Sequence, residues 1–206
     1  QDRGLVHPKN FKLPAKKKAR DIFKSMFSDS AAHAECKIGE MKMKVVSKQR
    51  NSRMCYVCGM DNPVGLKAPF YNMEDGSVMT LFRFEEEHQS FPQRVHGGLA
   101  ATMLDELGLR ALWALEGEDA LGVTMSMAVK YRKPVPYQEE LVGKGIVVKA
   151  SSKFASMKTE IYDRKGILLV SGDLRYIKLD AEQIAENVDA HEEMCYLIAD
   201  DVKEIF

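Results

Sequence analysis

The longest apolar stretch of the chain follows two consecutive glycines, Gly97 and Gly98. Residues 99–116 are rich in Ala, Leu and Met, which are strong helix formers. The apolar residues of this stretch are too widely spread to share one narrow helical stripe: Leu99, Met103, Leu104, Leu107, Leu109, Leu112, Trp113 and Leu115. A helix that is apolar on nearly every face is a buried helix. We therefore predict a central buried helix over 99–116, which ends at Gly117.

Runs with the character of β-strands flank this helix on both sides. Residues 66–73 and 77–84 precede it and are joined by Asp75-Gly76, a strong hairpin signal. Four more runs follow the helix, at 122–131, 140–149, 154–163 and 168–179. Their short connections favour an antiparallel, meander-like arrangement. The pattern predicts an α+β fold in which an antiparallel sheet wraps around one long helix.

The two ends of the chain carry opposite charge. Residues 1–50 hold 13 Lys and Arg against 5 Asp and Glu, whereas residues 180–206 hold one Lys against 9 acidic residues. Residues 15–27 predict a short helix, and residues 36–46 predict either an edge strand or an extended arm. We divide the chain into a basic extension (1–53), the main domain (54–179) and a C-terminal amphipathic helix (180–206).

The predicted C-terminal helix has a regular apolar seam at alternating spacings of four and three. Its members are Ile184, Val188, His191, Cys195, Ile198, Val202 and Ile205. Such a seam requires a surface against which to pack. His191 lies on the seam and is interpreted as a packed histidine.

Composition and charge restrict the class of protein. The formal net charge is zero, which gives no case for a nucleic-acid or membrane partner. No apolar run approaches the ~18 residues of a membrane span. The first residues lack Met and the apolar core of a signal peptide, as in a trimmed start. Four cysteines form no disulfide framework, so we expect a cytoplasmic protein in a reducing compartment.

The cysteines raise the alternative of a metal site. His33 and Cys36, together with Cys55 and Cys58, have the local spacing of zinc ligands. A single Cys-x-x-Cys pair has little specificity, and the segment that carries His33 has no firm structural assignment. The sequence therefore favours free thiols and no metal.

The glycine pair and Asp105 supply two chemical groups. Backbone N–H groups of Gly97 and Gly98 at a helix N-terminus are able to stabilise an oxyanion, and Asp105 is able to act as a general base or as a nucleophile. Eight residues along one helix separate Gly97 from Asp105 by ~12 Å. Both groups must lie within ~3 Å of the reacting atoms. The spacing therefore predicts a homodimer, in which Gly97 of one subunit faces Asp105 of the other.

Several motifs of this chain resemble one known family. They are Cys58-Gly59-Met60-Asp61-Asn62-Pro63-Val64-Gly65-Leu66, Val95-His96-Gly97-Gly98 with Asp105 nine residues after the His, Gly122-Val123-Thr124, Tyr131-Arg132-Lys133-Pro134-Val135 and Asp163-Arg164-Lys165-Gly166. Over about residues 54–179 the chain resembles the hotdog-fold acyl-CoA thioesterases of the phenylacetate-degradation type. The resemblance implies a hotdog fold, Asp105 as the catalytic carboxylate and Gly97 as the oxyanion donor. It also implies a homodimer or a dimer of dimers, and no cofactor other than the coenzyme A of the substrate.

The resemblance also assigns supporting residues. His96 is expected to orient the turn, and Thr124 falls where a hydroxyl commonly lies near the thioester. Ser90 occupies a position where the family often has Asn or Gln, which leaves the substrate open.

Glu106 lies four residues before Arg110, a spacing typical of a surface ion pair. The remaining expected contacts to coenzyme A are Gly98, Arg132, Lys133, Lys149, Ser151, Ser152 and Lys153, the cations because coenzyme A carries phosphates.

Two alternatives stay open at this level. A hydratase or dehydratase on the same fold would need a separate acid–base pair, and no such motif is present. A non-catalytic acyl-CoA-binding or sensing module, with the basic N-terminal arm on nucleic acid, is the other. Residues 1–50 hold only one convincing short helix, which is too little for a helix-turn-helix.

Overall fold

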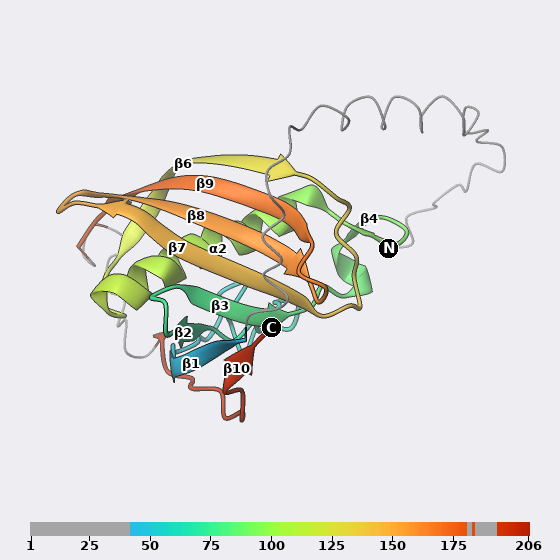
Figure 1. Ribbon diagram of the computed structural model, residues 1–206, viewed down its shortest axis with the longest axis horizontal. Helices are drawn as coiled ribbons and strands as arrows, with labels where there is room; N and C mark the ends of the chain where they lie inside the picture. The colour runs from blue at the N-terminus through green and yellow to red at the C-terminus, as the bar shows by residue number, and fades with distance from the viewer. Residues whose placement is uncertain (1–41, 181–182, 184–192) are drawn as a thin grey trace, which may run out of the picture. The chain divides into compact units, whose positions relative to one another are not determined.

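The computed structural model describes residues 42–180, 183 and 193–206, all of which belong to the unit Lys37–Phe206. Its main feature is an eight-stranded sheet in the order β10-β1-β2-β3-β7-β8-β9-β6, with every neighbouring pair antiparallel (Figure 1). The strands are β1 (Met43–Lys48), β2 (Tyr71–Met73), β3 (Val78–Phe82), β6 (Gly122–Tyr131), β7 (Leu141–Ala150), β8 (Phe154–Asp163), β9 (Leu168–Lys178) and β10 (Glu204–Ile205). A separate hairpin pairs β4 (Gln89–Phe91) with β5 (Arg94–Val95) after the 3-10 turn η2 (Glu86–His88).

One long helix, α2 (Gly97–Glu116), lies behind the strands β6 to β9 in Figure 1. His96 caps its N-terminus, because its Nδ1 accepts a hydrogen bond of 3.0 Å from the N–H of Gly98. The side chains of Met103, Leu104 and Leu107 are fully buried in the main hydrophobic core. Among the described residues, no helix has the length and apolarity needed to cross a membrane.

The predicted α+β fold, an antiparallel sheet around one central helix, is confirmed. Two predicted strands have the observed bounds, β6 and β8, and Gly76 turns the β2–β3 hairpin with a φ of 78°. Two details differ. Only Tyr71–Met73 of the predicted run 66–73 is a strand. The strands also do not follow a simple meander, because β6 pairs with β9 while β7 pairs with β3.

Both ends of the main domain extend beyond the predicted boundaries. Strand β1 lies in the sheet although its residues precede 54, and β10 pairs with it through Met43 and Ile205. The C-terminal helix prediction is therefore wrong for residues 194–206, which hold an extended segment and β10. The reason is tertiary: Asp200 accepts hydrogen bonds from Lys48 (2.6 Å to Oδ1) and Tyr71 (2.9 Å to Oδ2), and Ile205 is buried beside β1. The predicted helix over 15–27, and residues 181–182 and 184–192 of the predicted tail helix, lie outside the described residues.

The helix approaches the sheet closely because glycines face it. A Cβ on Gly145 of β7 would lie 2.5 Å from the carbonyl oxygen of Leu107, and one on Gly143 would lie 2.9 Å from the Leu107 side chain. On β9, a Cβ on Gly172 would lie 3.4 Å from the Leu104 side chain. These strands therefore allow backbone-to-backbone packing that larger residues would prevent.

We expect Gly145→Ala to separate α2 from β7, because the new Cβ meets backbone and not a flexible side chain. The free energy of unfolding should fall by about 3 kcal/mol or more. The matched control is Gly76→Ala, where a Cβ meets open space and only the positive φ opposes the change, at about 1 to 2 kcal/mol. Urea unfolding measures both. The emission of Trp113, the single tryptophan and a buried residue of α2, should shift only in Gly145→Ala. Equal losses and an unchanged spectrum would contradict the prediction.

Candidate active site

Asp105 lies at the middle of α2, with its carboxylate held by two hydroxyl groups from the sheet. Thr124 of β6 donates a hydrogen bond of 2.6 Å to Asp105 Oδ1. The Tyr176 hydroxyl of β9 lies 3.0 Å from the same oxygen and 2.6 Å from the backbone carbonyl of Asp105. The carboxylate is half-buried, so it is fixed in direction while its second oxygen, Oδ2, is left for other contacts.

Tyr176 is the contact that sequence reasoning missed. Its side chain is only 2 % exposed, and burial, reinforced by the charge of Asp105, raises its pKa well above the usual value. The hydroxyl therefore keeps its proton and remains a donor. Tyr176 pairs directly with Thr124 in the β6–β9 register, a relation that becomes readable only once the strand order is known.

The N-terminus of α2 offers one free donor and not the two expected. Because His96 Nδ1 accepts from Gly98, the N–H of Gly98 is already satisfied. The N–H of Gly97 has no acceptor within the part of the chain that the structure describes. Tyr131, near the end of β6, donates a hydrogen bond of 2.8 Å to the carbonyl of Gly97 and fixes this turn.

The structure does not bring all predicted catalytic residues together in one chain. Gly97 and Asp105 are eight residues apart on the same helix, which places them ~12 Å apart along its axis. Ser90 is exposed on β4, where its Oγ donates to the carbonyl of Val95 at 3.5 Å, at the limit of a hydrogen bond. Among the predicted catalytic residues of one chain, Thr124 forms a hydrogen bond with Asp105.

The prediction of a surface ion pair between Glu106 and Arg110 is wrong in its location. The pair forms, with Arg110 Nε donating to Glu106 Oε1 at 2.8 Å, but Arg110 is only 1 % exposed. Its guanidinium packs between the rings of Phe70 and Trp113, 4.5 and 4.4 Å from their centroids. The burial depends on residues distant in sequence, so the i,i+4 spacing alone did not reveal it.

The predicted contacts to coenzyme A divide into two groups within one chain. Gly98 lies in the first turn of α2, and Arg132 and Lys133 follow the end of β6 next to it. The others surround the β7–β8 turn: Lys149, Ser151, Ser152 and Lys153. This turn lies beside the start of β6, because Phe154 pairs with Ile177 and Ile177 pairs with Val123. The ten residues of β6 therefore separate the groups by roughly 30 Å.

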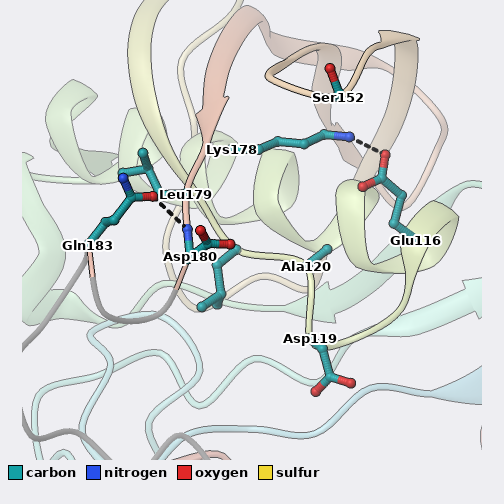
Figure 2. A pocket seen from close by; sticks show the side chains of 9 residues that line it. Glu116, Asp119, Ala120, Ser152, Lys178, Leu179, Asp180 and Gln183 are labelled. Atoms are coloured by element: carbon teal, nitrogen blue, oxygen red, sulfur yellow. Dashed lines mark hydrogen bonds and ion pairs between the residues drawn. The ribbon is translucent and has the colours of Figure 1, made fainter.

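A pocket of about 350 Å³ lies at the opposite end of α2 from Gly97 (Figure 2). Its lining residues are Glu116, Asp119, Ala120, Leu121, Ser152, Lys178, Leu179, Asp180 and Gln183. Lys178 is paired with Glu116, as the dashed line in Figure 2 shows. Three carboxylates against this one paired cation make the pocket unsuitable for phosphates, and it does not include Asp105.

The fold and the helix-borne carboxylate define a class, the hotdog-fold proteins. Comparison with known proteins agrees. The family model of the thioesterase superfamily matches residues 93–170. Human acyl-coenzyme A thioesterase 13 is 31 % identical over 98 residues, which cover 47 % of this chain and 69 % of that protein. The chain belongs to the thioesterase superfamily and is a thioesterase.

Solved structures share the fold. A thioesterase superfamily protein aligns with a TM-score of 0.55 and 21 % identity, over 78 % of this chain and 79 % of its own. The PaaI protein of the E. coli phenylacetic acid degradation operon aligns with a TM-score of 0.50 and 13 % identity, over 55 % and 80 %. The fold that the resemblance implied is therefore confirmed.

We expect Tyr176→Phe to lower the free energy of unfolding by about 1–3 kcal/mol, because it removes a buried hydroxyl that donates to Asp105 and leaves Thr124 as the remaining side-chain donor to Oδ1. Tyr196→Phe is the matched control, since its hydroxyl also donates to an aspartate, Asp61, but at the surface. The control should leave stability nearly unchanged. Chemical denaturation of both variants measures the difference, and equal stabilities would show that the Tyr176 hydroxyl bond is not structurally important.

Proposed function

We propose that this thioesterase hydrolyses acyl-CoA thioesters to a free acid and coenzyme A, in a homodimer with two composite sites. The membership of the superfamily supports thioester hydrolysis, and the named substrate of the human relative supports the acyl-CoA class. Each composite site combines Asp105 of one chain with the Gly97 N–H of its partner.

The observation that carries the proposal is the position of both groups along one edge strand. Strand β6 ends the sheet; Thr124 near its start holds Asp105, while Tyr131 at its end holds Gly97. Antiparallel pairing of β6 with its own copy around residues 127–128 would place the partner's Tyr131 opposite Thr124. The partner's Gly97 then lies beside Asp105.

The exposed surface of β6 supports this pairing. Val123, Met125 and Tyr131 are 39, 53 and 45 % exposed, although they are large apolar or aromatic side chains. An unpaired apolar edge strand is a template for a further strand. Continuing the sheet through β6 of a second chain would pair the backbone groups of β6 that have no partner among the described residues, and would cover these side chains.

The chemistry then requires only groups of the protein and a water molecule. The Asp105 carboxylate takes a proton from water as the water oxygen attacks the thioester carbonyl. The partner's Gly97 N–H, at the positive end of the helix dipole, stabilises the oxyanion. Collapse of the tetrahedral intermediate breaks the C–S bond, and the leaving thiolate takes up the proton. Direct attack by Asp105, with later hydrolysis of the anhydride, is the alternative route. Neither route uses a cofactor beyond the coenzyme A of the substrate.

The same pairing brings together the two groups of expected coenzyme A contacts. The start of β6 in one chain lies beside the end of β6 in the other. Arg132 and Lys133 of one subunit would therefore lie near the partner's β7–β8 turn, with its Lys149 and Lys153. Cations from both chains would then surround the phosphates of one coenzyme A.

We expect Asp105→Asn and Asp105→Ala to lower kcat by ~10²–10⁴-fold, the usual contribution of a general base or nucleophile. Glu116→Gln, which removes an exposed carboxylate at the far end of α2, is the control and should keep wild-type turnover. Free-thiol release from a panel of acyl-CoA substrates measures all of them. Retention of more than a tenth of wild-type kcat by both Asp105 variants would disprove the assignment.

The oxyanion donor is tested with proline, which removes the N–H while its φ suits the first position of a helix. A side chain at Gly97 meets the Tyr131 ring at 3.4 Å, an ordinary contact distance. Gly97→Pro should therefore keep the fold but lower kcat by ~10²–10³-fold. Gly97→Ala keeps the N–H and should stay within a few-fold of wild type. Equal loss in the two variants would mean that bulk, and not the lost donor, is responsible.

Mixed dimers test the composite site directly. A dimer of one Asp105→Asn chain and one Gly97→Pro chain has one site with both lesions and one site with neither. Co-expression with two affinity tags isolates it, and its kcat should be about half of the wild-type value. If each chain held a complete site, the mixed dimer would be as inactive as its parents. A fully active monomer in analytical ultracentrifugation would also overturn the proposal.

A further inference from the structure

Three side chains that are able to bind a metal ion lie close together beside α2. One of them is Glu106, the residue that follows Asp105. They are Cys55 and Cys58, from the turn before β2, and Glu106 of the helix. One ligand atom from each lies within 4.8 Å of the others, and Cys55 Sγ is 3.7 Å from Glu106 Oε2. Around a tetrahedral Zn²⁺, bonds of ~2.3 Å to sulfur and ~2.0 Å to oxygen separate the ligand atoms by about 3.5–3.8 Å.

Backbone and hydroxyl groups already orient the two sulfur atoms. The N–H of Val57 donates to Cys55 Sγ at 3.3 Å. The Ser52 hydroxyl accepts from the N–H of Cys55 at 3.1 Å and lies within hydrogen-bond distance of Cys58 Sγ, at 3.2 Å. The hydrogen bond from Gly59 N–H to the Cys55 carbonyl, 2.8 Å, closes the turn. Partners of this kind stabilise thiolate ligands and fix their direction.

The buried Arg110 guanidinium orients the Glu106 carboxylate toward the thiols. Arg110 binds Glu106 through Oε1, which leaves Oε2 toward Cys55. Within residues 42–180, 183 and 193–206, Oε2 has no other partner. A carboxylate oxygen is a normal ligand for Zn²⁺ beside thiolate sulfur.

We propose that Cys55, Cys58 and Glu106 bind a divalent, thiophilic metal ion such as Zn²⁺, with the fourth position taken by water. The charges balance: two thiolates and one carboxylate against Zn²⁺ and the Arg110 guanidinium. Cys58 is 2 % exposed, while Cys55 is half-buried and gives the ion access to solvent. The sequence favoured free thiols, because a single Cys-x-x-Cys pair has little specificity, and the fold adds Glu106 as a third candidate ligand.

Such an ion would anchor the turn of residues 52–59 to α2 at the position next to Asp105. It takes no part in the proposed thioester chemistry, because Asp105 faces Thr124 and Tyr176 of the sheet. The metal site and the composite active site can therefore be tested independently. Metal content and thermal stability report on the former, and thiol release reports on the latter.

The test uses the full chain, reduced with a phosphine and freed of metal by a chelator. Titration with Zn²⁺ against a chromophoric indicator should give one ion per chain, and Zn²⁺ should raise the Tm. Co²⁺ should give thiolate-to-metal charge-transfer absorption and the intense visible bands of tetrahedral coordination. Cys55→Ser and Cys58→Ser should lose more affinity than the about 10–100-fold that removal of an outer-shell partner costs.

Glu106→Gln and Cys195→Ser complete the design. Glu106→Gln should weaken Zn²⁺ binding at least about 10-fold while Co²⁺ keeps its thiolate bands. Cys195→Ser removes an exposed thiol outside the cluster and should bind as the wild type does. Cys58→Ala, with urea unfolding, separates loss of a ligand from loss of the fold.

Three results would overturn the assignment. The first is a Zn²⁺ affinity of the wild type no greater than that of Cys55→Ser, and the second is an unchanged Zn²⁺ affinity in Glu106→Gln. The third is a metal-free protein that forms a Cys55–Cys58 disulfide with oxidised glutathione and binds no Zn²⁺.

Discussion

The close packing of α2 on glycines of the sheet determines the position of every group in the candidate site. The Leu107 carbonyl oxygen lies only 2.5 Å from the place that a Cβ on Gly145 would take, and Leu104 packs near Gly172. This contact sets the distance between the helix and the strands. It therefore also sets the distances from the Thr124 and Tyr176 hydroxyls to Asp105. A helix displaced outward by the thickness of a methyl group would leave Asp105 beyond the 2.6 and 3.0 Å contacts that now hold it. The packing of α2 on the sheet therefore also fixes the hydrogen-bond geometry of Asp105.

Strand β6, at the edge of the sheet, also fixes the separation between Asp105 and Gly97. Because Thr124 and Tyr131 belong to one strand, the distance between the carboxylate and the Gly97 turn is fixed by β geometry as well as by the helix. Neither element can shorten to bring the two groups together. In the proposed homodimer, symmetry would complete the site, since an antiparallel copy of β6 exchanges the two ends of the strand.

The sequence predicted the elements well where local pattern and burial agree. The apolar helix, the Asp75-Gly76 hairpin and the alternating strands β6 and β8 all depend on nearby residues. It failed where a distant partner decides. The spacing of four and three before Ile205 also fits a helix, but pairing with Met43 makes the segment a strand. Tyr176 carries no motif, and its role follows only from the β6–β9 register.

Asp105 and Glu106 show how one helical step separates two environments. Consecutive residues point about 100° apart on a helix, so Asp105 faces two neutral hydroxyls while Glu106 faces a buried cation and two thiols. Arg110 stacks between Phe70 and Trp113 and cannot follow Asp105 toward the sheet. The charge of Glu106 is compensated locally, whereas Asp105 has no ion pair within the described part of the chain. An uncompensated carboxylate that is held in direction by neutral donors is free to take a proton from water, and a compensated one is not. The sequence places two acids side by side, and the packing of Arg110 against Glu106 is the structural reason why we assign the proposed chemistry to Asp105.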